Sequence, residues 1–296
     1  MAAAALRRHY AKLCELSDFR DPAIISWINE VLPDEPAKQR PHRKAWEFAM
    51  AASFLEDVGC LRDEARVLDV GAGKEAFLYW LTNRVGRVTA IDIYGQGHFS
   101  ESEAPAAMLS EPSLYAPYPF RSDRLEVLSM DARALEFPDQ SFDAVVSCSS
   151  IEHFGSREEI ASSAREIGRV LRPGGHAFIV TELFVRRSLV DFAPIHFAAR
   201  VLTAGRRAPT ATLRRRHGLS EMFTPRELHR DVIKPSGLRL MQPLDRSMSE
   251  DTWSNVTIAH DDGSYTTTTG DPFPSILLRG GRSVFTSVCL PLEKAG

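Results

Sequence analysis

The sequence predicts an α/β protein whose centre is a doubly wound, mostly parallel β-sheet with helices on both faces. Between residues 67 and 182, short apolar runs rich in β-branched side chains alternate with stretches of helical periodicity. The first run, Val67 to Val70, stops at a glycine turn and is followed by a helical pattern. Neighbouring parallel strands need a crossover, usually a helix, so this alternation favours a parallel sheet.

Seven strands and two well-marked helix starts are expected. The strands are the apolar runs at residues 67–70, 87–93, 125–130, 142–148, 176–182, 238–241 and 283–290. Ser156 with Glu159, and Thr224 with Glu227, have the spacing of a capping box. In this motif two side chains three residues apart bond each other's backbone amides and start a helix.

Residues 1–62 are expected to form an N-terminal helical extension. Leu6, Tyr10 and Leu13 recur at helical spacing, and a second apolar stripe follows them. Residues 63–296 would then form one larger domain that carries the sheet.

Two long stretches interrupt this larger domain and are expected to be insertions. Residues 183–222 carry aromatic and basic side chains without a clear period, and residues 243–281 are polar. Loops of this length in a compact domain usually serve function or are mobile. We expect them, with the N-terminal helices, to build the wall of a ligand site and a lid. The basic stretch at residues 200–217 is expected to be a solvated face.

Composition limits the partners and the location. The chain has 296 residues, 44% hydrophobic and 25% charged, the balance of an ordinary globular protein. Its net charge of −3 gives no overall attraction to nucleic acid or membranes, and no apolar run is long enough to span a bilayer. The four cysteines are scattered without a CxxC pair, which is typical of a reduced, cytoplasmic protein.

The glycine turn after the first strand predicts a nucleotide-containing cofactor. Gly71 and Gly73 let the backbone pass close to a ligand, with a helix N-terminus behind it. Asp92 ends the second strand, where a carboxylate can accept hydrogen bonds from ribose hydroxyls. With Ala76, the glycines satisfy a loose GxGxxG/A, so NAD is one option. Asp69, two residues before Gly71, favours S-adenosylmethionine (SAM).

Two further stretches of the sequence also favour SAM. After the glycine turn and the acidic strand end come "MDARALEFPDQSFDAVVSCSSIEHFG" and "IGRVLRPGGHAFIVTE". With these pieces, residues 65–182 resemble the class I SAM-dependent methyltransferases, especially their small-molecule branch of the methyltransferase-domain-11 type. The resemblance implies a Rossmann-like sheet of seven strands whose last strand is antiparallel. Residues 238–241 and 283–290 would then form an antiparallel pair.

The resemblance also implies a set of cofactor contacts: Asp69, Gly71, Ala72, Gly73, Asp92, Ile93, Asp131, Ala132 and Ser149. By this comparison the glycine turn holds the methionine and ribose part of SAM, and Asp92 holds the ribose hydroxyls. Asp131 and Ala132 meet the adenine edge, and Ser149 faces the reactive methyl. Glu75 departs from the family, because it stands where a third glycine is usual. Its side chain either points outward or alters the end of the site that holds the SAM carboxylate.

Glu152 and His153 follow the fourth strand directly and are the catalytic candidates. The methyl of a sulfonium is already electrophilic, so the enzyme has to align a nucleophile and remove its proton. A neutral imidazole suits that task near pH 7. The competing interpretation is that His153 is a helix-entry residue bonded to the backbone.

The same stretch raises the question of a metal. "IEHFG" resembles the cation-binding ExxEH of ubiquinone-pathway and small-RNA 2′-O-methyltransferases, although Ser149 occupies the first Glu position. With Glu182 as the replacement carboxylate, Glu152, His153 and Glu182 would hold Mg²⁺.

The sequence therefore predicts a SAM-dependent methyltransferase that acts on a small-molecule acceptor at a hydroxyl oxygen, with a sugar as one option. An NAD(P)-dependent oxidoreductase and a catalytically inactive SAM-binding module stay open as alternatives. We expect no nucleic acid partner, no membrane span and a cytoplasmic location. A homodimer is compatible with the sequence.

Overall fold

The computed structural model describes residues 6–33, 42–97, 99–189, 202, 221–259, 265–267 and 276–296. The strands are β1 (Arg66–Val70), β2 (Arg87–Asp92), β3 (Leu125–Ser129), β4 (Phe142–Cys148), β5 (Leu171–Arg186), β6 (Arg239–Leu240), β7 (Val256–Ala259), β8 (Tyr265–Thr267), β9 (Leu277–Gly280) and β10 (Ser283–Glu293).

The α-helices are α1 (Pro22–Val31), α2 (Arg43–Asp57), α3 (Ala76–Thr82), α4 (Arg157–Val170), α6 (Pro225–Leu228), α7 (Lys234–Ser236) and α8 (Glu250–Ser254). Short 3₁₀ turns are η1 (Leu16–Arg20), η3 (Ala106–Leu109), η4 (Pro112–Tyr115), η5 (Ser122–Arg124) and η6 (Ile151–His153), and η9 (His229–Ile233) is a π-helical turn between α6 and α7.

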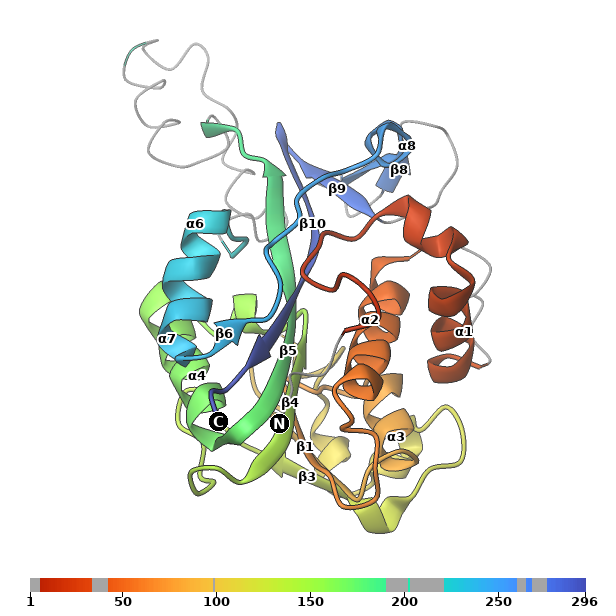
Figure 1. Ribbon diagram of the computed structural model, residues 1–296, viewed down its shortest axis with the longest axis vertical. Helices are drawn as coiled ribbons and strands as arrows, with labels where there is room; N and C mark the ends of the chain where they lie inside the picture. The colour runs from red at the N-terminus through yellow and green to blue at the C-terminus, as the bar shows by residue number, and fades with distance from the viewer. Residues whose placement is uncertain are drawn as a thin grey trace.

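The parallel half of the sheet has the strand order β3-β2-β1-β4-β5 of a doubly wound sheet. β10 pairs antiparallel with β5 along most of its length, and β6 pairs antiparallel with the C-terminal end of β10. Figure 1 shows α4, α6 and α7 on one side of the sheet and α1, α2 and α3 on the other. These features confirm the predicted α/β class, the mostly parallel sheet and its antiparallel last strand.

The sheet has ten strands in the described part of the chain, where seven were expected. The additional strands β7, β8 and β9 come from the segment 243–281, which the sequence predicted as an insertion without regular structure. β9 pairs antiparallel with β10, and β7 runs parallel to β9. Each of the three is three or four residues long, too short to show a pattern in the sequence. β9 pairs with the edge of β10 that β5 leaves free, and β7 and then β8 extend the sheet outward from β9.

The predicted helix that includes Tyr10 and Leu13 does not form. Leu13 instead makes an antiparallel bridge with Val288 of β10, and the backbone N–H of Cys14 donates to the carbonyl of Ser287 at 2.9 Å. This segment covers the part of β10 that lies between its pairings with β9 and β6. An uncovered edge there would leave backbone groups without partners, so extended pairing prevails over the helical spacing of the side chains.

The helical part of the N-terminal extension consists of α1 and α2. On α2, Trp46 and Phe54 are fully buried and belong to the same apolar cluster as Phe178 of β5. The described part of the first 62 residues thus shares a core with the sheet, and the division of the chain at residue 62 stays a prediction.

Both predicted capping boxes form. The backbone N–H of Ser156 donates to Oε2 of Glu159 at 2.7 Å, and the N–H of Glu159 donates to Oγ of Ser156 at 3.3 Å. At the start of α6, Thr224 and Glu227 exchange the same two hydrogen bonds at 2.8 and 3.3 Å. These caps fix where α4 and α6 begin over the sheet.

Most of the insertion at residues 183–222, including the basic stretch at 200–217, lies outside the described residues. Among the helices that are described, none combines the length and the apolar character needed to cross a membrane.

Candidate active site

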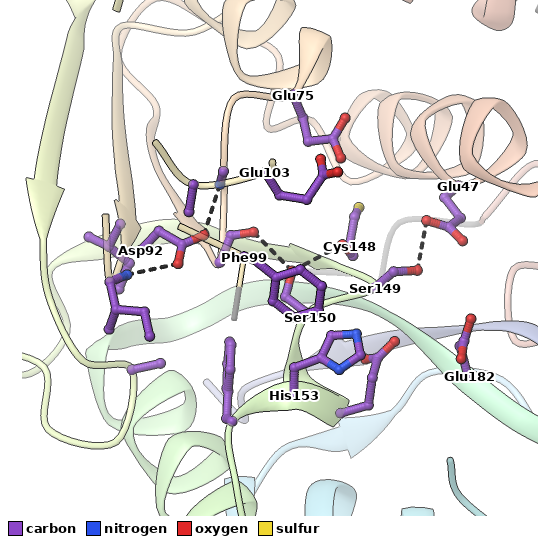
Figure 2. Close-up of a pocket in the computed structure, with 18 of the residues that line it drawn as sticks. Glu47, Glu75, Asp92, Phe99, Glu103, Cys148, Ser149, Ser150, His153 and Glu182 are labelled. Carbon is purple, nitrogen blue, oxygen red and sulfur yellow. Dashed lines mark hydrogen bonds between the residues drawn. The ribbon is translucent and has the colours of Figure 1, made fainter. Parts of the chain in front are cut away.

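A cavity of about 840 Å³ opens at the carboxyl ends of the parallel strands. Ligands of doubly wound sheets bind at this edge, outside the strand ends. The turn after β1, the segment after β2 and η6 line it, and residues of α2, β7 and β9 complete its wall. Figure 2 shows Asp92 on one side, Glu47 and Glu182 on the other, and Ser149 and His153 between them.

Most of the predicted cofactor residues line this cavity: Gly71, Gly73, Asp92, Ile93, Asp131, Ala132 and Ser149. Asp69 and Ala72 are not part of the lining, since their side chains are buried at 5% and 2% exposure. The predicted cofactor contacts of these two residues therefore stay predictions. Burial raises the pKa of the Asp69 carboxyl to about 7, and the negative charge of Glu75 adds to this rise.

Gly71 and Gly73 form the turn after β1, and neither position has room for a side chain. Their φ angles are +70° and +51°. A Cβ on Gly71 would lie 2.4 Å from Cβ of Ser150, and one on Gly73 would lie 2.8 Å from the carbonyl oxygen of Glu103. Glycine is thus required for both conformation and space, and the turn presents bare backbone to the cavity.

The carboxylate of Asp92 faces the cavity from the end of β2 (Figure 2). Its Oδ2 accepts a hydrogen bond from the N–H of Gly73 at 3.0 Å, and its Oδ1 accepts one from the N–H of Ile93 at 2.7 Å. Burial raises the pKa of Asp92, while these two bonds act in the opposite direction. Each oxygen keeps a second lone pair, so the carboxylate can accept two neighbouring hydroxyls, as on a ribose.

Next to Asp92 the cavity lining is apolar, and we call this part the slot. It consists of Ile93, Met130 and Ala132, and Ile93 is 43% exposed although it is large and apolar. Asp131 forms an ion pair with Arg133 at 2.6 Å, and the hydrogen bond from Arg133 lowers the pKa of Asp131. The predicted adenine contact of Asp131 would compete with this pair, whereas the apolar side chains suit the faces of a flat ring.

Glu75, in place of the family's third glycine, lines the cavity (Figure 2), and its side chain is 30% exposed. Its Oε1 lies 3.2 Å from Nζ of Lys44 on the first turn of α2. Burial lowers the pKa of Lys44, but Glu75 and Glu47 outweigh this effect and leave it raised. Nζ of Lys44 also donates to the carbonyl of Cys148 at 3.3 Å. Of the two expectations for Glu75, the second is therefore favoured: the residue alters the end of the site next to the glycine turn.

Ser149 has a left-handed backbone, with φ of +50°, which is uncommon for a residue other than glycine. Its Oγ donates to Oε2 of Glu47 at 2.9 Å. The other oxygen of Glu47 accepts a hydrogen bond from Oγ of Ser287 at 2.5 Å, and Glu47 is 1% exposed. Helix α2 thus inserts a buried carboxylate between the end of β4 and the middle of β10, and this carboxylate ties Ser149 in place. Such backbone strain concentrates at functional sites.

Glu152 and His153 both line the cavity from η6, directly after β4. Glu152 is 1% exposed, and its Oε2 accepts a hydrogen bond from Oγ1 of Thr181 at 2.8 Å. Its Oε1 is buried and has no hydrogen-bond partner in the described part of the chain. Burial raises the pKa of Glu152.

His153 pairs through Nδ1 with Oε2 of Glu221 at 2.9 Å, and its ring lies 5.0 Å from that of Phe99. Burial lowers the pKa of His153, but the bond to Glu221 and the charge of Glu152 together raise it above its usual value. The imidazole is therefore held by a carboxylate, where the competing interpretation expected a bond to the backbone.

The metal site predicted on Glu152, His153 and Glu182 does not form. Successive side chains of a strand point to opposite faces, so Thr181, which binds Glu152, and Glu182 lie on different sides of β5. Glu182 forms an ion pair with Arg43. Among the residues that are described, no three His, Cys, Asp or Glu side chains converge on a metal position.

Sequence reasoning missed several residues of the cavity wall, namely Arg43, Lys44, Glu47, Phe99, Thr257 and Leu278, and it also missed Glu221, which pairs with His153. They come from α2, from the loop after β2 and from the two predicted insertions. No local motif marks these residues. The sequence indicated them only through the general expectation that the N-terminal helices and the insertions build the wall of the site.

Comparison with known proteins agrees with this arrangement. Residues 68–179 match the family model of a methyltransferase domain. The chain is 35% identical over 115 residues to a phosphatidylethanolamine N-methyltransferase of Cereibacter sphaeroides, covering 39% of this chain and 49% of that protein. It is 41% identical over 59 residues to a probable tRNA methyltransferase 9B of Mus musculus, covering 20% and 13%. The matched segments thus span half or less of these relatives.

Among solved structures, a putative sarcosine dimethylglycine methyltransferase from Galdieria sulphuraria has a TM-score of 0.45 at 18% identity, covering 67% of this chain and 60% of that one. The matched segment contains the glycine turn, the Asp92 strand end and η6. Residues 68–179 are therefore similar to the methyltransferase domain of the class I, SAM-dependent enzymes, whose cofactor is SAM.

Proposed function

We propose that the chain transfers a methyl group from SAM to a hydroxyl oxygen of a small polar acceptor, with His153 as the general base. The observation that carries this proposal is the position of His153. It lines the cavity directly after β4, next to Ser149, and among the described residues its Nε2 has no hydrogen-bond partner.

The residues of the cavity fit SAM. The bare backbone at Gly71 and Gly73 would approach the methionine and ribose part, and Asp92 would accept the ribose hydroxyls. The slot formed by Ile93 and Met130 would hold the adenine. When bound, SAM supplies an electrophilic methyl group on a positively charged sulfur.

His153 would remove the proton of the acceptor hydroxyl as the oxygen attacks the methyl. Only the neutral imidazole can do this, and the raised pKa of His153 means that activity should increase as the pH rises through that value. Activity increases with pH because deprotonation converts the His153 imidazolium into the neutral imidazole, which is the base.

The half of the cavity beyond Ser149 would bind the acceptor. Its wall includes the Arg43–Glu182 ion pair and the hydroxyl of Thr257, with Leu278 as an apolar contact. Charged and hydroxyl groups suit a polar acceptor with several hydroxyls, such as a sugar, better than an apolar one.

An amine acceptor is a second candidate, because carboxylates outnumber cations in the wall. The acidic lining residues are Glu47, Glu75, Asp92, Glu103, Asp131, Glu152 and Glu182, against the cations Arg43, Lys44 and Arg133. One of the relatives is a phosphatidylethanolamine N-methyltransferase. A reduced, cytoplasmic setting is part of either proposal, since the four cysteines are buried and unpaired.

The test is a screen with labelled SAM over sugars, phenols, carboxylic acids and amines, with products identified by mass spectrometry. O-methylated products support the proposal, N-methylated products select the second candidate, and transfer to no acceptor favours an inactive SAM-binding module. Binding of NAD with no binding of SAM would return the oxidoreductase alternative.

Once an acceptor has been identified, His153→Ala should lower kcat by roughly 10²- to 10⁴-fold, which is the usual rate loss when a general acid or base is removed. SAM affinity by calorimetry should stay near the wild-type value, because the imidazole serves the acceptor. If His153→Ala turns over at the wild-type rate from pH 6 to 9, His153 is a structural residue only.

A further inference from the structure

Glu221, the residue that pairs with His153, lies at the C-terminal end of the predicted insertion at 183–222. Residues 221–223 run alongside β5 just before α6. The N–H of Phe223 donates to the carbonyl of Glu182 at 3.0 Å, and the N–H of Phe184 donates to the carbonyl of Phe223 at 2.8 Å. Leu183 and Phe223 form a parallel bridge, so this segment is a one-residue addition to the edge of β5.

Arg157 on the first turn of α4 ties the same segment down. Its guanidinium donates to the carbonyl of Glu221 at 3.2 Å and to the carbonyl of Met222 at 2.7 Å. The guanidinium also lies 4.2 Å from the ring centre of Phe223, whose side chain is fully buried. The backbone of residues 221–223 is therefore fixed from two sides, at Phe223 by β5 and at Glu221 and Met222 by Arg157 of α4.

From this position the side chain of Glu221 crosses to η6. Its Oε2 lies 2.9 Å from Nδ1 of His153, and the two side chains are 43% and 32% exposed. The ring of Phe99 lies against the imidazole at 5.0 Å between ring centres. A carboxylate on Nδ1 selects the tautomer that carries the proton there, which leaves Nε2 as the acceptor of a second proton.

We propose that Glu221 is the positioning residue of the general base, holding the His153 imidazole with Nε2 toward the acceptor and stabilising its protonated form. This inference rests on the proposed function of His153. It adds Glu221, which lies outside the matched methyltransferase segment and 68 positions after His153 in the chain.

The proton and electron balance of the step assigns each partner a role. The acceptor oxygen forms the O–CH₃ bond with its lone pair, the C–S bond breaks with its electrons going to sulfur, and the hydroxyl proton passes to Nε2 of His153. The imidazole becomes a cation at that moment. The carboxylate of Glu221 is next to it, so the new charge is formed beside an existing opposite charge.

Three charged groups act on this imidazole from three elements. Glu221 and Glu152 raise the pKa of His153, and Lys44 on α2 lowers it. Loss of the Glu221 charge should therefore move the acidic limb of the rate profile to lower pH, while a purely structural defect would lower the rate without moving the limb.

The experiment compares Glu221→Gln, which keeps the shape and removes the charge, with Glu221→Ala and with the control Glu64→Gln. Glu64 is an exposed residue just before β1, away from the cavity lining. Both Glu221 variants should lower kcat about 10- to 100-fold, with SAM affinity and acceptor KM near wild type, and Glu221→Gln should shift the acidic limb downward. The control should change none of these.

A second readout needs no acceptor. The His153 imidazole resonance, assigned by its loss in His153→Ala, is titrated by NMR in wild type and in Glu221→Gln. A lower midpoint in the variant supports the contact even if no acceptor is found and the proposed function fails. An unchanged midpoint overturns the inference. So does wild-type kcat in both Glu221 variants when His153→Ala is inactive.

Discussion

The carboxylate of Asp92 reaches the cavity with both oxygens already bound to backbone N–H groups, at 3.0 and 2.7 Å. These bonds hold it in one orientation before any ligand arrives. A ribose would therefore meet a preset pair of acceptors, which lowers the ordering cost of binding.

Asp92→Ala should weaken SAM binding by about 2 to 4 kcal/mol, because hydrogen bonds to a charged group are lost and the glycine turn loses its bond at Gly73. Calorimetry with SAM measures the change. Asp123→Ala, in the exposed turn before β3, is the matched control and should bind as wild type. Equal affinity of the folded Asp92→Ala protein and wild type would refute the ribose assignment.

Asp69 makes stability depend on pH. Its folded pKa of about 7 lies above its ordinary value, so its favourable contribution is complete below about pH 4 and is lost as the pH rises through 7. The buried carboxylate must ionise in the folded state at a cost that the unfolded chain does not have. An Asp69→Asn variant has an amide at this position, which does not titrate.

The unfolding free energy of Asp69→Asn relative to wild type should therefore increase by about 2 to 3 kcal/mol between pH 5 and pH 8. Denaturant unfolding at the two pH values measures this difference, and groups common to both proteins cancel. Parallel pH curves for the two proteins would show that Asp69 ionises at its ordinary pKa.

At the scale of the element, α2 does more than cover the sheet. Glu47 bonds Ser149 at the end of β4 and Ser287 in β10, and Lys44 on the same helix reaches Glu75 at the start of α3. One helix outside the matched segment thus connects three structural elements around the cavity. Its position sets the space between the glycine turn and the acceptor half.

Glu47→Ala should lower the unfolding free energy by about 2 to 4 kcal/mol, because the buried hydroxyl of Ser287 and the half-buried hydroxyl of Ser149 lose their acceptor. It should also weaken SAM binding, since the left-handed conformation of Ser149 loses its tie. Denaturant unfolding and calorimetry test both effects. Glu56→Ala, on the exposed far end of α2, should change neither by more than about 0.5 kcal/mol. Similar losses in the two variants would show that Glu47 has no special role.

At the scale of the whole molecule, the two halves of the cavity come from different parts of the chain. The cofactor half is built from Gly71, Gly73, Asp92 and the strand ends of the matched segment 68–179. The half proposed for the acceptor takes its wall largely from α2, β7 and β9. Similarity to known methyltransferases therefore identifies the cofactor and leaves the acceptor to be found by experiment.

The sequence by itself determined the parallel core, the glycine turn, the acidic end of β2 and both capping boxes. These features are local, since each is set by a few neighbouring residues and a repeat of side chains along one element. The missing side chain of Gly71 and the acid of Asp92 can be read from one strand–helix–strand unit, β1–α3–β2, and both residues line the cavity.

Only the tertiary structure decided which segments complete the edge of β10 and which side chains meet in the acceptor half. Leu13 joins β10 although its spacing is helical, because the unpaired edge offers hydrogen bonds that a helix would leave unmade. Glu221 meets His153 because β5 and Arg157 hold its backbone there. Such contacts join residues far apart in the sequence and depend on which edges and faces remain free once the core has formed, so no local pattern encodes them.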